Sequence, residues 1–159
     1  MNYFSKDSNW QKFKKILLSW IGTPYRHFAR VKGRGADCTM FVGAAWKELG
    51  VLTDVEFYYY PPDWYQHSAD NRIIEGITKH FEEFAISGIG MTRHKPSEEM
   101  IRGDLIVFST NKKGVLNHAG IYMGHKGMIH ASNSRGVTLF ELDDVWRKRI
   151  KVFFRVECI

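Results

Sequence analysis

The chain has 159 residues, of which 44% are hydrophobic, and its 11 Phe, 7 Tyr and 5 Trp exclude an intrinsically disordered chain. This length suits one substantial core, so we expect residues 1–159 to form a single domain. The net charge of +6 favours polyanionic partners such as nucleic acid, anionic lipid or an acidic cell-wall polymer. Because Lys and Arg are scattered, a role in solubility alone is the alternative, and without a DNA-binding motif no nucleic-acid partner is expected.

The sequence predicts neither a signal peptide nor a membrane span. Lys14 and Lys15 interrupt the only apolar stretch near the N-terminus, and no later run approaches the thickness of a bilayer. We therefore expect synthesis in the cytoplasm, with another component carrying the chain outwards if it acts beyond the membrane. Cys38 and Cys158 do not make a disulfide framework.

The first predicted element is a helix that begins near Ser8. Ser8 and Gln11 resemble a capping box, and Gly22 followed by Pro24 ends the helical pattern. Residues 22–36 are then predicted to form a loop. The apolar face of the helix carries Trp10, Phe13, Leu17, Trp20 and Ile21.

A second helix is predicted from Cys38 to Leu49, because apolar residues recur every three or four positions until Gly50. It follows a glycine-rich, flexible loop at residues 33–35. Cys38 then occupies the first turn, where unpaired backbone N–H groups and the helix dipole favour a thiolate. This position predicts a nucleophile, with a buried structural thiol as the alternative.

Residues 53–67 differ from the rest of the chain, because Tyr58-Tyr59-Tyr60-Pro61-Pro62-Asp63-Trp64-Tyr65 combines aromatic rings with two prolines. Two interpretations are open for this stretch. It is either a surface loop whose rings pack on the core, or one wall of a substrate groove. A further amphipathic helix is predicted from about Ala69 to Phe84.

From Arg102 onward the pattern changes to short apolar runs bounded by Gly, Asn or charged residues, which predicts strands. Because no helical pattern intervenes, we expect antiparallel pairing, and helices followed by strands make an α+β fold. The predicted strands cover residues 105–108, 118–123, 128–131, 137–140 and 151–156.

His118 and His130 are the candidates for a base, since both lie inside predicted strands among apolar neighbours. The hairpin between them decides whether they meet. A two-residue loop at His125-Lys126 would pair Gly124 with Gly127 and place them on opposite faces of the sheet. A three-residue loop over residues 124–126, or a bulge using one of the glycines, would pair Gly120 with His130 and place both histidines on one face.

The chemistry that these residues predict is that of an activated thiol. His118 would accept the proton of Cys38, giving a thiolate–imidazolium pair that attacks a carbonyl carbon, and His130 would orient His118. The N–H of Cys38 and the hydroxyl of Tyr25 would serve as oxyanion donors.

With these residues the chain resembles the NlpC/P60 family of papain-like cysteine peptidases, in four segments that follow the family's order. Trp20–Tyr25 is similar to W-x-G-T-P-Y, and Asp37–Val42 to the D-C-S-G-[FL]-[VT] nucleophile helix. Arg102–Phe108 is similar to P-G-D-L-[VL]-F-F. Asn117–Gly124 and Met128–Ser132 are similar to H-V-G-I-Y-x-G and to [FM]-I-H-A.

The resemblance implies a papain-like α+β fold in which the nucleophile helix packs on a C-terminal antiparallel sheet. It implies cleavage of a peptide or isopeptide bond in peptidoglycan stem peptides, commonly between D-glutamyl and diamino-acid residues, with no metal and no cofactor. The implied site has Cys38 as nucleophile, His118 as base and His130 as third polar residue, with Tyr25, Asp37 and Trp64 on the oxyanion and substrate-binding side.

A narrower resemblance is to the cell-wall peptidases of phages and gene transfer agents, which are encoded with tail genes. It is carried by Pro62-Asp63-Trp64 and by the ending Arg135-Gly136-Val137, Trp146–Ile150 and Phe153–Arg155. It implies phage-tail proteins as partners, and action at the cell wall or in the periplasm as part of a phage-like particle.

Two positions depart from the family pattern. Arg102 replaces the proline before Gly-Asp. Met40 replaces a small glycine two residues after the nucleophile, which puts the close packing and the shape of the cleft there in doubt.

Three alternatives stand beside the peptidase. An acyltransferase or lipid amidase would use the same Cys-His pair, although such relatives usually have the His before the Cys. A structural or binding tail protein would have lost catalysis, although all the candidate residues are present. A metal site of His118, His125 and His130 would lack the carboxylate and the helical spacing of common zinc hydrolases.

Overall fold

The computed structural model describes residues 1–57, 59–67 and 71–159. Its helical elements are η1 (Tyr3–Ser5), α1 (Asp7–Ser19), α2 (Cys38–Leu49), α3 (Trp64–His67), α4 (Arg72–Phe84) and α5 (Asp144–Arg149). Its strands are β1 (Arg30–Val31), β2 (Gly35–Ala36), β3 (Ile89–His94), β4 (Leu105–Phe108), β5 (His118–Gly124), β6 (Gly127–Ser132), β7 (Gly136–Glu141) and β8 (Ile150–Cys158).

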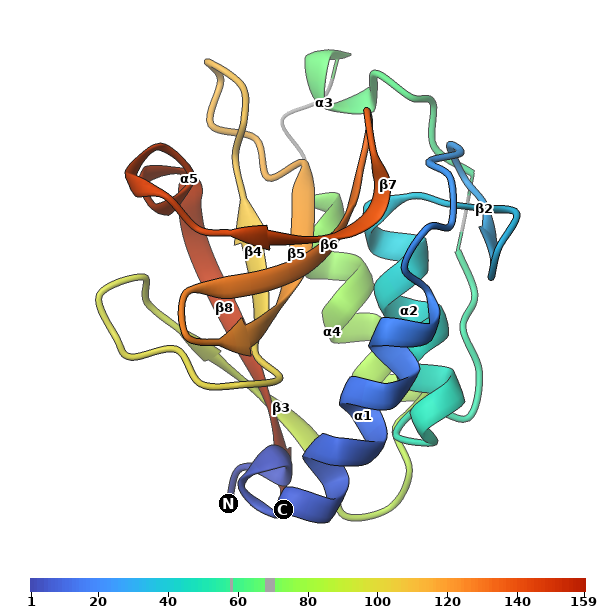
Figure 1. Ribbon diagram of the computed structural model, residues 1–159, viewed down its shortest axis with the longest axis vertical. Helices are drawn as coiled ribbons and strands as arrows, with labels where there is room; N and C mark the ends of the chain where they lie inside the picture. Colours follow the sequence, from blue (N-terminus) through green and yellow to red (C-terminus); the bar gives the residue numbers. More distant parts are fainter. Residues whose placement is uncertain (58, 68–70) are drawn as a thin grey trace.

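An antiparallel sheet with the order β3-β8-β4-β5-β6-β7 forms the centre of the described fold. Helices α1, α2 and α4 lie on one side of this sheet and α5 on the other (Figure 1). Successive strand residues point to opposite faces, so Leu105 and Val107 join the main core under the helices. Ile106 and Phe108 join a smaller apolar cluster on the α5 side. The α+β prediction is confirmed.

Helix α2 has the predicted bounds, because both of its ends are set by local chemistry. The Asp37 side chain accepts a hydrogen bond from the N–H of Met40, which makes it the N-cap. Gly50 closes the helix in the left-handed conformation, with φ of 91°. Trp46 and Leu49 are buried in the main core.

The capping box predicted at Ser8 and Gln11 is wrong. Helix α1 begins at Asp7, and its N-cap Lys6 makes no side-chain capping bond. The η1 turn lies directly before this helix, and its buried Phe4 stacks on Phe13 of α1 at a ring separation of 4.9 Å. This contact fixes the start of the helix one residue before Ser8. Tertiary packing therefore overrides the local capping signal.

Several short or exposed elements of the structure have no counterpart in the sequence prediction. The predicted loop 22–36 contains the short β1–β2 pair. Strand β3 pairs along the edge with β8, and its half-exposed side chains show little alternation. Helix α5 buries none of its residues, so it has no apolar periodicity. The predicted start of the third helix, Ala69, and Tyr58 of the aromatic stretch lie outside the described residues.

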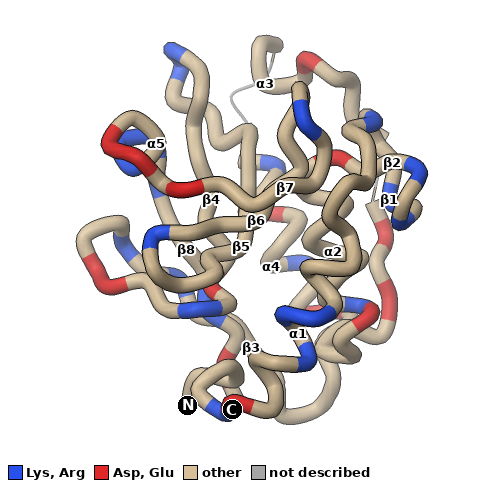
Figure 2. The backbone as a smooth tube through the Cα atoms, viewed as in Figure 1, with Lys and Arg blue, Asp and Glu red and all other residues tan. Residues whose placement is uncertain are grey.

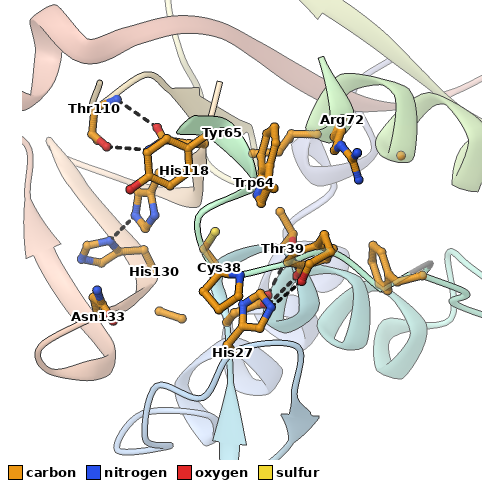
Figure 3. Close-up of a pocket in the computed structure, with 18 of the residues that line it drawn as sticks. His27, Cys38, Thr39, Trp64, Tyr65, Arg72, Thr110, His118, His130 and Asn133 are labelled. Carbon is orange, nitrogen blue, oxygen red and sulfur yellow. Dashed lines mark hydrogen bonds between the residues drawn. The ribbon is translucent and has the colours of Figure 1, made fainter. Parts of the chain in front are cut away.

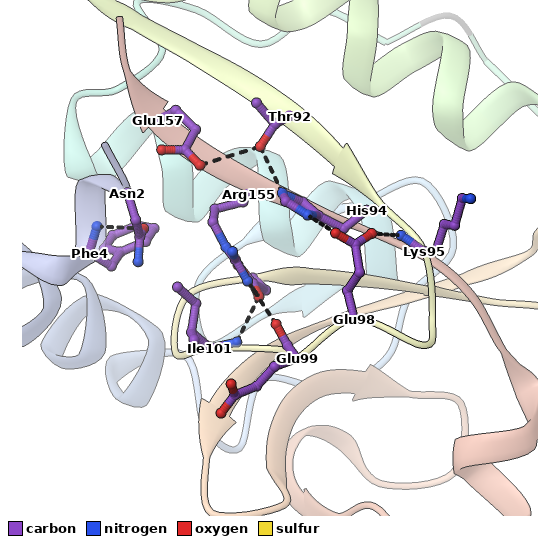
Figure 4. A network of polar contacts seen from close by, with 11 residues as sticks. Asn2, Phe4, Thr92, His94, Lys95, Glu98, Glu99, Ile101, Arg155 and Glu157 are labelled. Carbon is purple, nitrogen blue, oxygen red and sulfur yellow. Dashed lines mark hydrogen bonds and ion pairs between the residues drawn. The ribbon is translucent and has the colours of Figure 1, made fainter.

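A buried ion pair between Arg155 and Asp104 ties the C-terminal strand to the start of β4. Figure 4 shows Arg155 beside Glu99 and Ile101, which belong to the same network. Nε and Nη2 of Arg155 donate to the two carboxylate oxygens of Asp104 at 2.9 and 2.8 Å. The same Nη2 donates to the carbonyl of Glu99 at 3.0 Å, and the N–H of Ile101 donates to Asp104 at 2.8 Å. The Gly-Asp dipeptide of the predicted strand motif therefore anchors the middle of the sheet.

Lys and Arg are spread over several elements and alternate with acidic residues, without forming a single basic stripe in the view of Figure 2. Arg102, which departs from the family pattern, pairs with Asp7 at 3.1 Å and donates to the carbonyl of Phe4 at 3.2 Å. It therefore holds α1 against the sheet. None of the helices in the described part of the chain is both long and apolar enough for a bilayer span.

Candidate active site

The candidate site is a pocket of about 790 Å³ between the start of α2, the aromatic stretch, α4 and the sheet. Cys38, His118 and His130 all line it. Figure 3 shows the sulfur of Cys38 between the His118–His130 pair on one side and His27 and Thr39 on the other. The residues predicted from distant parts of the sequence are thus brought into one cavity.

Cys38 is the first residue of α2 and is buried. Burial raises the pKa of its thiol to about 12, and the negative charge of Asp37 adds to this effect. The backbone N–H groups of Ala119, Thr39 and Cys38 face the sulfur and act in the opposite direction. The expectation of a thiolate is wrong for the resting site, because desolvation outweighs the stabilisation from the helix start.

The hairpin between β5 and β6 brings the two histidines onto one face. Its turn residues His125 and Lys126 have positive φ angles of 50° and 64°, and Gly124 pairs with Gly127. The register then shifts at Met123, so that Tyr122 pairs with Met128. The two-residue loop that was predicted to separate the histidines is therefore present, and a bulge at Met123, rather than at one of the glycines, brings them onto one face.

His118 and His130 are joined directly by a hydrogen bond. Nε2 of His118 lies 2.7 Å from Nδ1 of His130, and the ring planes cross at 82°. Trp146 of α5 packs against both rings, at centroid distances of 5.8 and 5.9 Å. In the sequence Trp146 belongs only to the phage-type ending, and the exposed pattern of α5 gives no sign of this contact.

Both imidazoles are neutral in the resting site. Desolvation by burial, together with repulsion from His130 when both rings carry a proton, lowers the pKa of His118 to about 3. Burial alone lowers the pKa of His130 to about 4. Among the described residues, no hydrogen bond joins the Cys38 sulfur to either ring. The resting pair is therefore a thiol and an imidazole rather than the predicted ion pair.

The loop before His118 is fixed by a reciprocal pair of bonds. Nδ2 of Asn117 donates to Oγ1 of Thr110 at 2.8 Å, and the N–H of Thr110 donates to Oδ1 of Asn117 at 2.9 Å. Both residues line the pocket. This clamp holds the first residue of β5, which is His118, at the pocket's edge.

Tyr25 is half-buried and lines the same pocket. Burial raises the pKa of its phenol, and the charges of Cys38, Asp37 and Tyr65 raise it further. Its hydroxyl makes no hydrogen bond to any residue that the structure describes. The phenol is therefore a neutral donor that is available to a ligand.

Asp37 is 2% exposed and lies at the pocket's inner end, but its carboxylate is engaged within the protein. Oδ1 accepts from the N–H of Met40 at 2.9 Å, and Oδ2 accepts from the N–H of Phe28 at 2.9 Å and from the Tyr60 hydroxyl. The Thr39 hydroxyl is 3.3 Å from Oδ1. This geometry favours a helix cap over the substrate-binding role that the family resemblance implied.

Trp64 begins α3 and is buried while still lining the pocket. Its ring lies 5.9 Å below the guanidinium of Arg72 and packs edge-on against Tyr65. Tyr60, Pro62 and Tyr65 also line the pocket, so the aromatic stretch forms one wall of it, and its rings also pack against the core.

Met40 is buried and is not among the described residues that line the pocket. The departure from the family's glycine is therefore accommodated in the protein interior rather than in the cavity. The sequence suggested an effect of Met40 on the shape of the cleft, because it does not show which side of α2 faces the pocket.

The alternative metal site is not supported by the topology. His125 lies in the turn after β5, at the opposite end of the strand from His118, which is about 20 Å away at 3.3 Å per residue. Within residues 1–57, 59–67 and 71–159, no group of three or more His, Cys, Asp or Glu side chains could hold a metal ion.

Comparison with curated proteins finds related endopeptidases. The chain is 29% identical over 133 residues to the probable endopeptidase NlpC of Escherichia coli K12, covering 83% of this chain and 68% of that protein. It is 27% identical over 134 residues to a Haemophilus influenzae homolog, of which it spans 55%. A shorter match of 38% identity over 55 residues joins it to the E. coli murein DD-endopeptidase MepS/murein LD-carboxypeptidase, covering 34% of this chain and 28% of that protein.

Solved structures share the fold at low sequence identity. The NlpC/p60 domain of the peptidoglycan hydrolase SagA aligns with a TM-score of 0.55 at 19% identity, covering 91% of this chain and 96% of that one. RipD of Mycobacterium tuberculosis, described as a non-catalytic NlpC/p60 protein adapted to peptidoglycan binding, aligns with a TM-score of 0.53 at 14% identity, covering 92% and 95%. The NlpC/P60 family profile matches residues 22–155. The chain therefore belongs to the NlpC/P60 family.

Proposed function

We propose that this protein is a cysteine peptidase that hydrolyses peptide or isopeptide bonds in peptidoglycan stem peptides, of the γ-D-glutamyl–diamino-acid type, with Cys38, His118 and His130 as its catalytic residues. One observation carries the proposal. A thiol at a helix N-terminus and a hydrogen-bonded pair of imidazoles open into the same pocket. The chain is a hydrolase of the NlpC/P60 endopeptidase type, like its curated relatives.

The first step of the proposed mechanism moves a proton from Cys38 to His118. Because Nε2 of His118 is bonded to His130, Nδ1 is the ring nitrogen left for the thiol. Nδ1 accepts the thiol proton as the sulfur attacks the carbonyl carbon, since both groups start neutral. His130 accepts the Nε2–H of His118 and thereby keeps the tautomer that has a free Nδ1.

The second step releases the amine and then the acid. The C–N bond breaks as His118 returns its proton to the leaving amine, which leaves a thioester on Cys38. A water molecule, deprotonated by His118, then attacks the thioester, and the thiol is restored. The oxyanion formed in each step is assigned to the N–H of Cys38 and to the free hydroxyl of Tyr25.

The proposed place of action is the cell wall or the periplasm, reached as part of a phage-like particle. This part of the proposal rests on the resemblance of Pro62–Trp64 and of the Trp146–Ile150 ending to phage-type peptidases. Both segments contribute residues to the pocket wall. Detection of the chain in purified particles by mass spectrometry supports this placement, and its absence from them contradicts it.

Two rival functions make different predictions at the same site. A pure binding protein, as described for RipD, would retain peptidoglycan without releasing products. An acyltransferase would transfer the acyl group to an added amine rather than to water. Defined muropeptides incubated with and without an amine acceptor, followed by mass spectrometry, separate hydrolysis from transfer.

The decisive experiment compares Cys38→Ala with Cys158→Ala. Cys158 is exposed at the C-terminal end of β8 and serves as the matched control. We expect Cys38→Ala to abolish product release from purified peptidoglycan while circular dichroism stays unchanged. Cys158→Ala should act like the wild type. Undiminished hydrolysis by Cys38→Ala would overturn the mechanism.

A further inference from the structure

Tyr60 connects the aromatic stretch to the start of the nucleophile helix. Its hydroxyl donates to Oδ2 of Asp37, the carboxylate that caps α2. The Thr39 hydroxyl lies 3.1 Å from the same Tyr60 oxygen. Nε2 of His27 donates to the Tyr60 carbonyl at 2.5 Å, and the Phe28 ring packs edge-on against the Tyr60 ring at 5.2 Å. Both the side chain and the backbone of Tyr60 are therefore held.

The charge of Asp37 is the reason that this contact matters to the sulfur. Asp37 immediately precedes Cys38, and its negative charge is one of the causes that raise the pKa of the thiol. A hydroxyl that donates to the carboxylate draws part of its charge density away from the sulfur. Loss of that donor leaves the carboxylate more negative at the position where a thiolate has to form.

We propose that Tyr60 is a positioning residue of this centre, acting through Asp37: its hydroxyl restrains the capping carboxylate beside Cys38, and its anchored backbone fixes the aromatic wall of the pocket. The inference rests on the proposed function, in which Cys38 is the nucleophile. Through Tyr60 the aromatic stretch would act on the thiol of Cys38, in addition to forming one wall of the pocket.

The neighbouring Tyr59 offers a matched control. It is 67% exposed, it packs against His27 and Phe28, and it does not line the pocket. Its hydroxyl makes no bond to Asp37. Tyr59→Phe therefore removes the same chemical group one residue away, without removing a donor to the Asp37 carboxylate.

Several titratable groups surround the thiol and have to be held constant in the test. They include Asp37, Tyr25, Tyr60, His118 and His130, and His27 and Tyr65 line the same pocket. His118 and His130 are neutral above pH 7, and Tyr25 and Tyr60 have a raised pKa, so none of these four changes its charge between pH 7 and 9.5.

The test measures alkylation of Cys38 by iodoacetamide between pH 7 and 9.5. It uses a Cys158→Ser background, so that Cys38 is the one thiol that can be alkylated. In this range the rate follows the small thiolate fraction. We expect Tyr60→Phe to slow alkylation about threefold at each pH, which corresponds to a shift of about half a pH unit. Tyr59→Phe should leave the rate unchanged. An unchanged rate in Tyr60→Phe would overturn the proposal.

A double-mutant cycle separates an action through Asp37 from simple packing. Asp37→Asn keeps a capping acceptor but removes the charge, so alkylation should become faster. Addition of Tyr60→Phe to Asp37→Asn should then have no further effect on the rate. A slowing that persists in this background would overturn the proposal, because it would assign Tyr60 to packing alone.

Folding and the proposed function are checked separately. Circular dichroism and thermal melting establish that each variant is folded. If Tyr60→Phe does not fold, Thr39→Val replaces it, since Thr39 bonds within the same group, and an unchanged rate would again contradict the proposal. Alkylation needs no peptide substrate, so the effect of Tyr60 on the thiol is measured independently of hydrolysis. A wild-type protein that fails to hydrolyse peptidoglycan would refute the proposed function without deciding whether Tyr60 acts on Cys38.

Discussion

Nε2 of His118 and Nδ1 of His130 share one hydrogen bond of 2.7 Å, across a bulge in the hairpin that carries both residues. A single proton occupies this bond, so the tautomer of one ring fixes the tautomer of the other. With Nε2 of His118 protonated, its Nδ1 is free to act as a base. Trp146 and the other aromatic rings beside the pair keep it desolvated.

Replacement of His118 and His130 should separate their roles. We expect His118→Ala to lower kcat on a defined muropeptide by about 10²–10⁴-fold, because the proposed general base is lost. His130→Ala should lower kcat with little change in KM, and His130→Asn should lose less, since it retains a hydrogen-bonding group for Nε2. Steady-state kinetics measure this, and a wild-type kcat in His130→Ala would contradict the orienting role.

Removal of the Trp146 ring should shift the pKa values of His118 and His130 towards that of an exposed histidine. Burial is the first cause of the low pKa of both His118 and His130, so Trp146→Ala admits water and raises both pKa values towards 6.5. Trp146→Phe keeps an aromatic cover and serves as the control. Titration of the imidazole signals by nuclear magnetic resonance reads the shift. Identical titration curves in wild type and Trp146→Ala would show that other groups desolvate the pair.

The two histidines should also make folding stability depend on pH. Their folded pKa values, about 3 for His118 and about 4 for His130, lie below the ordinary value of 6.5, so the unfolded chain binds protons first as pH falls. The stability is therefore fully present above pH 6.5 and is lost as the pH falls from 6.5 to about 4 for His130 and to about 3 for His118. The slope is at most about 1.4 kcal/mol per pH unit for each histidine, and less for the partly exposed His118.

Urea denaturation at pH 7, 6, 5 and 4.5 measures this dependence. The double variant His118→Gln/His130→Gln removes both titrations, so its stability should fall less steeply with acidification than that of the wild type. Parallel curves for the two proteins would mean that the histidines remain hydrated in the folded state.

The Asp104–Arg155 pair should dominate the polar contribution to sheet stability. Asp104 is 1% exposed, so Asp104→Ala leaves the guanidinium of Arg155 without its bidentate partner and should destabilise the fold by about 3 kcal/mol. Lys47→Ala, which breaks an exposed pair with Asp54, is the control and should have a much smaller effect. Chemical denaturation compares the two, and equal effects would contradict this assignment.

The sequence by itself determined the elements whose signals are local. Asp37 and Gly50 set the ends of α2, because a side-chain cap and a left-handed glycine act within one turn. Strands β4 to β8 follow from short apolar runs between turn residues, and the ordered motifs identified the family. Strand β3 and helix α5 could not be predicted from the sequence, because their half-exposed or exposed side chains show no hydrophobic periodicity.

Only the tertiary structure decided the properties that arise between segments. The register of the β5–β6 hairpin depended on one bulge, which local propensity does not specify. The thiol at the start of α2 is neutral because neighbouring elements bury it, and desolvation outweighs the helix dipole that the sequence indicated. The same is true of Asp37: the family resemblance implied a residue on the substrate-binding side, but its carboxylate accepts hydrogen bonds from Phe28 and Tyr60 within the protein. Electrostatics and register depend on what packs around a group, and that is set by contacts far apart in the chain.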